Sequence, residues 1–289
     1  MDFCALCESK QPTLQRFWRN NTAIVQCQTC GLLFASPMPS AEVLKDFYCK
    51  DSSGSNIQAY TKRPHRSLVS RYIQDSRIRR DFRILKSFER IQKEPGKILD
   101  FGCGIGMFLN HARERGWDAW GIDLDPERIA YGKKQFGLNL FQGELETHHF
   151  PKETFDVVTL RNVLDHLASP QNTLKEIQRI LKKTGLVFIN VHDVQGWRAQ
   201  KYKETWNALW PPLHLHYFSH QTLERMLEKA GLKFYRVPGV NLKEGIKLLA
   251  VRQDAPYQRS TARKVFEKAV YTLVQKLHFF SFFFFSGCK

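Results

Sequence analysis

One segment settles the architecture of this chain, and it reads Lys97-Ile-Leu-Asp-Phe-Gly-Cys-Gly-Ile-Gly-Met-Phe-Leu109. An apolar strand runs to Asp100, glycines follow at positions 102, 104 and 106, and a helical pattern begins after them. Because glycine tolerates left-handed backbone conformations, this spacing allows a sharp turn and lets a ligand approach bare main chain. The segment therefore predicts a strand, a ligand-binding loop and a helix in that order.

The order of glycines and acids distinguishes between two classes of cofactor. A dinucleotide site usually reads G-x-G-x-x-G, with its acid only after the next strand. This chain reads G-x-G-x-G instead, and Asp100 stands two residues before the first glycine. We therefore predict that the loop binds S-adenosylmethionine rather than NAD.

Strands and helices alternate after residue 96, which predicts an α/β fold, a mostly parallel Rossmann-like sheet with helices on both faces. Gly116, Gly185 and Gly231 stand where helices are expected to end, and Ser219 is a candidate N-cap. The seven expected strands are residues 97–101, 119–124, 138–142, 155–163, 186–191, 233–237 and 245–252. Helices are expected near residues 105–115, 126–136, 170–183 and 219–230.

Four of the seven cysteines form two knuckles, Cys4-x2-Cys7 and Cys27-x2-Cys30. Two such knuckles predict a tetrahedral thiolate site for a structural Zn²⁺ ion. The alternative is a pair of disulfides in a secreted module, but the first residues show no export signal that would support it. We expect the other three cysteines to be unpaired thiols.

Changes in composition predict four regions along the chain. Residues 1–36 are expected to form the zinc ribbon, 37–95 a helical linker or lid, 96–254 the cofactor-binding domain and 255–289 a basic, aromatic tail. The helical pattern from 64 to 93 is strongly basic. These basic residues indicate either a solvent-exposed helix face or a lid over an anionic acceptor. We favour the solvent-exposed face.

The net charge of +16 favours polyanionic partners, and the 43% hydrophobic content excludes a disordered chain. RNA, anionic lipid headgroups and pyrophosphate-linked substrates all fit this charge. The tail has six phenylalanines within residues 279–285 beside several basic residues. This pattern favours an anchor at the membrane surface over a spanning helix, with packing on the body or in a dimer as the alternative.

Several side chains are placed to hold the cofactor. Asp100 is expected to fix the loop and the cofactor amino group, while backbone N–H groups of the loop face the methionine carboxylate. Asp123 ends the second strand, where an acid can accept both ribose hydroxyls, and Glu144 follows the third strand toward the adenine. The predicted cofactor-binding residues are Asp100, Gly102, Cys103, Gly104, Gly106, Asp123, Leu124, Glu144 and Arg161.

The sequence resembles the class I S-adenosylmethionine-dependent methyltransferases. The motifs that carry this resemblance lie at residues 98–106, 121–126, 155–158, 162–167 and 181–186. Through residues 210–219 and 222–227 the chain is similar to the ubiquinone-biosynthesis-like branch, which is frequent among bacterial surface-glycan enzymes. The four-cysteine module is similar to that of sugar C-methyltransferases. The resemblance implies a seven-stranded methyltransferase sheet and a nucleotide-linked sugar, lipid-linked sugar or quinone-like acceptor.

Three histidines are candidates for the general base. Methyl transfer from a sulfonium is an in-line displacement, and an oxygen or carbon acceptor must also lose a proton. His166 follows the fourth strand at the carboxyl edge of the sheet, where ligands bind in such folds. His214 and His216 lie two residues apart after the fifth strand, so they face one side if the segment is extended. We predict that these histidines line the acceptor pocket.

Three functions remain open at this stage. The first is methylation of a small molecule, which can be anionic or lipid-linked, by a cytoplasmic enzyme that is peripheral on the inner face of the membrane if the tail binds lipid. The second is methylation of RNA, because a zinc ribbon and a charge of +16 suit phosphate binding. The third is a scaffold without catalysis, which the intact glycines and acids disfavour.

Overall fold

A computed structural model describes residues 3–10, 13–40, 42–44, 68–236 and 245–257. The described residues up to Ala255 belong to one compact unit. Residues 258–289 of the predicted tail lie outside the described residues, as do residues 41 and 45–67 of the predicted linker. None of the helices within the described ranges is long and apolar enough to cross a membrane. The four domain boundaries stay predictions.

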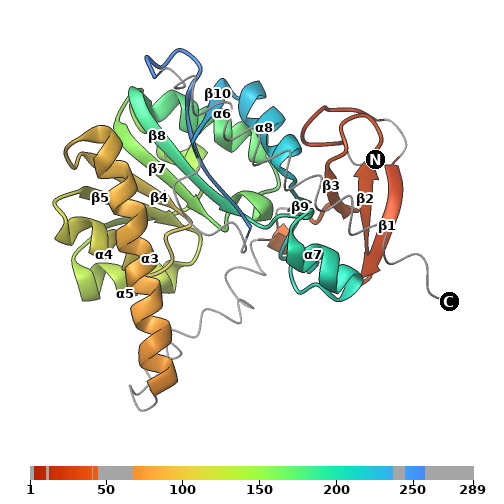
Figure 1. Cartoon of the computed structure of the whole chain (residues 1–289), viewed down its shortest axis with the longest axis horizontal. Coiled ribbons are helices and arrows are strands. Elements are labelled where there is room, and N and C mark those ends of the chain that lie inside the picture. Colours follow the sequence, from red (N-terminus) through yellow and green to blue (C-terminus); the bar gives the residue numbers. More distant parts are fainter. Residues whose placement is uncertain (1–2, 11–12, 41, 45–67, 237–244, 258–289) are drawn as a thin grey trace. The chain divides into compact units, whose positions relative to one another are not determined.

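Seven strands form the central sheet, in the order β10-β11-β8-β7-β4-β5-β6 (Figure 1). β11 runs antiparallel to both of its neighbours, while the ladders from β8 to β6 are parallel. This confirms the predicted α/β class and the seven-stranded sheet. The strands are β4 (Lys97–Phe101), β5 (Asp118–Asp123), β6 (Asn139–Gln142), β7 (Phe155–Arg161), β8 (Leu181–Val191), β10 (Leu232–Arg236) and β11 (Ile246–Arg252).

The helices begin where the local sequence can cap them. The Asp125 carboxylate accepts the first backbone N–H groups of α5, and Ser219 forms a capping box with Thr222 at the start of α8, which confirms the predicted N-cap. The helices are α3 (Leu68–Gln92), α4 (Met107–Glu114), α5 (Pro126–Phe136), α6 (Pro170–Ile180), α7 (Trp197–Tyr202) and α8 (His220–Lys229). Short 3₁₀ turns are η1 (Leu145–His148), η2 (Leu164–His166) and η3 (Lys203–Thr205).

Two predicted boundaries around β7 and β8 are wrong. Gly185 does not end a helix, because α6 stops at Ile180 and β8 begins with the next residue. Leu181 is fully buried and pairs with Phe155 of β7, so pairing with the neighbouring strand prevails over the helical pattern. β7 itself ends at Arg161 rather than at Val163, because the chain turns into η2 there.

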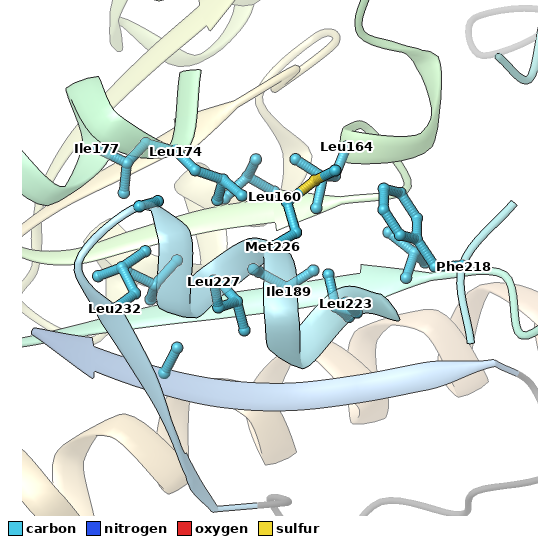
Figure 2. Close-up of a cluster of buried hydrophobic side chains, with 14 of the residues drawn as sticks. Leu160, Leu164, Leu174, Ile177, Ile189, Phe218, Leu223, Met226, Leu227 and Leu232 are labelled. Atoms are coloured by element: carbon cyan, nitrogen blue, oxygen red, sulfur yellow. The ribbon is translucent and has the colours of Figure 1, made fainter. Parts of the chain in front are cut away.

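The core lies on both faces of the sheet. Figure 2 shows side chains of α6 and α8, among them Leu174 and Leu227, packed over Leu160 and Ile189 of β7 and β8. Phe188 points to the other face because side chains alternate along a strand, and its ring lies 5.9 Å from that of Phe88 in α3. The sheet is therefore covered on both sides, as a parallel sheet requires.

A second sheet holds the N-terminal segment, and its fourth strand comes from far along the chain. β1 (Thr13–Arg19), β2 (Thr22–Cys27) and β3 (Leu33–Ser36) form an antiparallel meander, and β9 (His216–Tyr217) pairs with β3. Phe34 lies opposite His216 in this ladder, and Lys229 Nζ donates to the Leu6 carbonyl at 2.8 Å. The N-terminal module is thus tied to the segment that carries two of the predicted histidines.

Candidate active site

The glycine loop after β4 leaves open space at its centre. Gly102, Gly104 and Gly106 have φ values of 75°, 56° and 81°, which non-glycine residues rarely adopt. A Cβ atom on Gly102 would overlap Val163, and one on Gly106 would lie 2.8 Å from Leu138 Cδ1. One on Gly104 would meet no atom within 4 Å. The loop therefore packs tightly at its two ends and can receive a ligand against its middle.

Asp123 connects the ends of three strands. Its Oδ2 accepts the Gly104 N–H at 2.7 Å, and its Oδ1 accepts the Asp125 N–H at 3.0 Å. Burial raises the pKa of this carboxyl, against the opposing hydrogen bonds from the Asp125 and Gly104 backbone. The Gly143 N–H donates to the Asp123 carbonyl at 3.0 Å, which brings the exposed Glu144 next to this edge. The ribose and adenine contacts of Asp123 and Glu144 stay predictions.

Asp100 belongs to a buried network of charges. Thr159 donates to Asp100 Oδ1 at 2.5 Å, and Arg161 approaches Oδ2 at 3.5 Å. Arg161 also donates to Asp81 of α3 at 3.1 Å, and its guanidinium lies 4.0 Å above the ring of Phe108. Burial raises the pKa of Asp100, while the charge of Arg161 and the Thr159 hydroxyl oppose this. These contacts fix the side chains of Asp100 and Arg161 beside the glycine loop. Their contacts with the cofactor stay predictions.

The remaining predicted cofactor residues, Cys103 and Leu124, support the loop differently. Cys103 is buried, and burial raises the pKa of its thiol well above the ordinary value. A Cβ atom on Gly121 would lie 2.7 Å from Cys103 Sγ, so this thiol packs against β5. Leu124 is half-buried directly after Asp123. The Cys103 thiol therefore acts as a small packing group under the loop.

Histidines gather around a buried carboxylate at the ends of β7 and β8. The ring of His214 lies 4.6 Å from that of His166 and 4.8 Å from that of His192, measured between centroids. Asp165 Oδ2 lies 2.8 Å from His192 Nδ1, and Asp165 Oδ1 lies 3.7 Å from His166 Nε2. His216 packs instead beside Phe218, with ring centroids 6.2 Å apart. The structure thus brings together two of the three predicted histidines.

His192 is the residue of this cluster that the sequence analysis missed. It directly follows Val191, the last residue of β8, and so lies at the carboxyl edge of the sheet. That position was the only signal in the sequence that could have identified it. Because the predicted strand also ended at Val191, the same reasoning that selected His166 after β7 applies to His192 after β8.

The histidine cluster has unusual electrostatics. Burial, together with the charge of the nearby His166, lowers the pKa of His214 to about 3. Burial likewise lowers the pKa of His216 to about 4, although the nearby Ala168 backbone opposes this shift. Burial alone would raise the pKa of Asp165, but the His192 hydrogen bond and the other imidazoles lower it. The lowered pKa favours the carboxylate form of Asp165, although the side chain is buried.

Among the described residues, two buried polar atoms beside His166 lack a hydrogen-bond partner, as do both ring nitrogens of the neighbouring His216. The two atoms beside His166 are Asp165 Oδ1 and His214 Nδ1. Asp165, His166 and His214 each have an oxygen or nitrogen atom that could bind a metal ion, and these three atoms lie within 4.8 Å of one another. Such buried atoms normally have a partner, so this corner of the molecule is built to face a polar ligand or water.

The glycine loop and the histidine cluster are neighbours. Val163, which touches Gly102, immediately precedes the turn η2 that carries Asp165 and His166. The carboxyl ends of the parallel strands β4, β5, β7 and β8 all meet at this edge. A donor bound against Gly104 and an acceptor bound beside the histidines would therefore lie next to each other.

The four cysteines form a compact cluster in the N-terminal module. Cys4 Sγ lies 3.4 Å from Cys30 Sγ, and Cys7 Sγ lies 3.5 Å from Cys27 Sγ. All four sulfur atoms lie within 4.8 Å of one another. These separations exceed the length of about 2.05 Å that a disulfide requires. The predicted four-cysteine cluster is confirmed as a geometric feature.

A family model described as a methyltransferase domain matches residues 72–237, which is more than half of the chain. The chain therefore belongs to this family and is an S-adenosylmethionine-dependent methyltransferase of class I.

Curated relatives include ubiquinone biosynthesis O-methyltransferases. The protein of Pseudomonas fluorescens is 29% identical over 108 residues, which cover 35% of this chain and 47% of the relative. That of Azoarcus sp. is 25% identical over 172 residues, covering 55% and 73%. The chain thus spans less than half the length of the Pseudomonas relative.

A solved structure shows the same fold. Magnesium protoporphyrin IX methyltransferase from Synechocystis, with bound S-adenosylhomocysteine, superimposes with a TM-score of 0.56 at 13% identity. The similarity covers 74% of this chain and 100% of that one.

The role predicted for Asp123 can be tested by calorimetry. Asp123→Ala should abolish measurable binding of S-adenosylmethionine, because the variant loses the ribose acceptor and the contact with the Gly104 N–H. Asp118→Ala, at the other end of the same strand, is the matched control and should bind like the wild type. Unchanged affinity of Asp123→Ala would reject this placement of the cofactor.

The buried histidines predict a pH dependence of folding. Unfolded histidines have a pKa of about 6.5, whereas His214 and His216 stay neutral in the folded chain well below that pH. The free energy of unfolding should therefore be full above about pH 6.5 and decrease as the pH falls, by at most about 1.4 kcal/mol per pH unit for each ring.

Urea denaturation at pH 7.5 and pH 5.5 measures this effect. The double variant His214→Asn, His216→Asn should show a smaller difference between the two pH values than the wild type. His149→Gln, which changes an exposed residue, should retain the wild-type difference. Equal pH dependence in the double variant and the wild type would contradict the assignment of buried neutral rings.

Proposed function

We propose that the chain transfers a methyl group to a hydroxyl of a small molecule, of the quinone-precursor or sugar type. The observation that carries this proposal is the acid–histidine cluster beside the glycine loop, centred on Asp165 and His214. A hydroxyl acceptor must lose a proton as it is methylated, and imidazoles are the usual groups for that task. The names of the curated relatives, which are O-methyltransferases, support the same acceptor atom.

Bound S-adenosylmethionine supplies an electrophilic methyl group. Gly104 and its neighbours would offer backbone to the methionine part, and Asp123 would accept the ribose hydroxyls. The acceptor would lie over His166 and His214, which hold its hydroxyl near the methyl donor. Alignment of two reactants in this way can account for about 7–11 kcal/mol of the barrier.

The proposed acceptor class can be tested by following the label from methyl-tritiated S-adenosylmethionine. We expect label in a small organic molecule when the full chain is incubated with a panel of catechols, polyprenylated catechols and nucleotide-linked sugars. His214→Ala should bind the cofactor normally and transfer label more slowly. Label found instead in added ribosomal RNA would contradict the small-molecule proposal and establish the RNA function that the charge of +16 also suits.

We further propose that the four-cysteine cluster holds a structural Zn²⁺ ion. A zinc ion bonded to four thiolates at about 2.3 Å separates the sulfurs by about 3.8 Å, close to the two distances in this cluster. Hydrogen bonds from the Cys30 and Thr29 backbone and from Cys7 lower the pKa of Cys27 to about 7, although burial alone would raise it. Cys27 therefore gives the thiolate that zinc binds more readily than Cys4 and Cys30, whose pKa values burial raises.

Metal analysis tests the zinc proposal. We expect one zinc ion per chain by inductively coupled plasma mass spectrometry, and loss of that zinc with a lower melting temperature in Cys30→Ser. Cys49→Ser, which leaves all four cysteines of the cluster unchanged, should keep the metal. A chain that contains no zinc after expression in zinc-supplemented medium would refute the proposal.

A further inference from the structure

The pairing of Asp165 with His192 resembles the arrangement of a general base and the acid that orients it. Asp165 Oδ2 lies 2.8 Å from His192 Nδ1, a distance typical of a hydrogen bond to a charged acceptor. An ionised carboxylate can only accept, so His192 must donate its Nδ1–H. The neutral ring then carries its lone pair on Nε2. The hydrogen bond thus fixes which nitrogen of His192 can take a proton.

The two partners differ in exposure as such a pair requires. The Asp165 side chain is 2% exposed, whereas that of His192 is 35% exposed. His214 and His216 are both buried, so His192 is the more accessible ring at this edge. Among the described residues no hydrogen bond reaches the Nε2 atom of His192. This nitrogen is therefore available to an acceptor that enters from solvent.

Neighbouring groups hold the pair in place from three directions. The backbone N–H of Leu215 donates to the Asp165 carbonyl at 2.8 Å, so the segment before β9 is fixed to η2. The ring of Trp206 lies edge-on to His192, with centroids 5.9 Å apart. The ring of His214 lies on His192 at 4.8 Å in a T-shaped arrangement. Packing of this kind restricts the rotation of the imidazole.

We propose that Asp165 and His192 form a dyad in which Nε2 of His192 removes the proton of the acceptor hydroxyl and Asp165 positions the ring. This inference rests on the proposed function, because it needs a hydroxyl acceptor. It assigns the base to a residue other than the three histidines that the sequence indicated.

The reaction balances without any further reagent. The acceptor O–H bond breaks and its proton goes to His192 Nε2, while an oxygen electron pair forms the new bond to the methyl carbon. The carbon–sulfur bond breaks with its electrons going to sulfur, so the sulfonium becomes a neutral thioether. The positive charge thus passes to the His192 imidazolium, which the Asp165 carboxylate stabilises. The imidazolium then loses its proton to solvent.

A spectroscopic test of the dyad needs no acceptor. In the full chain labelled with ¹⁵N-histidine, long-range ¹H–¹⁵N spectra should show His192 protonated on Nδ1, with the signal assigned by its loss in His192→Gln. Asp165→Asn should change this tautomer, because the amide of the new side chain can donate to Nδ1. A His192 ring protonated on Nε2 in the wild type would overturn the proposal.

A kinetic test uses the acceptor that the tritium label identifies. His192→Gln and Asp165→Asn should each lower kcat by about 100-fold or more, while calorimetry finds the affinity for S-adenosylmethionine within about threefold of the wild type. His220→Gln is the matched control, because His220 also is 35% exposed and lies 3.8 Å from a carboxylate, that of Asp193. It should transfer methyl groups at the wild-type rate.

The possible results separate the dyad from its alternatives. A labelled hydroxyl product that forms at an undiminished rate in His192→Gln overturns the dyad and leaves the proposed function intact. Label in RNA alone overturns the proposed function, while the tautomer still reports on the hydrogen bond. Activity that disappears with EDTA and returns with Mg²⁺ in wild type but not in Asp165→Asn would make Asp165 a cation ligand and overturn the dyad.

Discussion

The buried carboxylate of Asp165 is the group on which the arrangement of the acceptor side depends. Its side chain holds His192 at the end of β8, and its backbone carbonyl accepts the N–H of Leu215 before β9. Burying an ionised carboxylate is costly unless polar groups surround it. In this chain, imidazole rings from three separate segments surround the carboxylate of Asp165. The constraint that stabilises the fold at this point thereby assembles a cluster suited to proton transfer.

Strand pairing links the N-terminal module to the candidate active site. β9 carries His216 and pairs with β3, so the sheet next to the four cysteines is completed by a strand from the acceptor segment. The Ala35 N–H donates to the Leu215 carbonyl at 2.9 Å, one residue away from His214. Disorder in the cysteine cluster would therefore disturb β3 and, through the pairing of β3 with β9, the segment that carries His214 and His216. This gives the module a structural reason to precede a methyltransferase domain.

Local patterns were enough to predict the strand, the glycine loop and the helix that follow one another from Lys97. The glycines at 102, 104 and 106 and the acid at the end of β5 act within short segments, so their spacing carries the information. The acceptor side depends on contacts between residues that are distant in the sequence. No local pattern predicts that His216 pairs with Phe34 or that Asp165 accepts a hydrogen bond from His192. Gly185 shows the same limit, because pairing of Leu181 with β7 ends the preceding helix early.

We propose that the donor and acceptor sides share one edge of the sheet, with the Asp165–His192 pair facing the transferred group. A crystal structure of the full chain with bound S-adenosylhomocysteine tests it most directly. We expect the ribose to lie against Asp123, the amino-acid part along the glycine loop and the sulfur to point toward His192. A ligand whose sulfur points away from the histidine cluster, or whose ribose lies elsewhere, would contradict it.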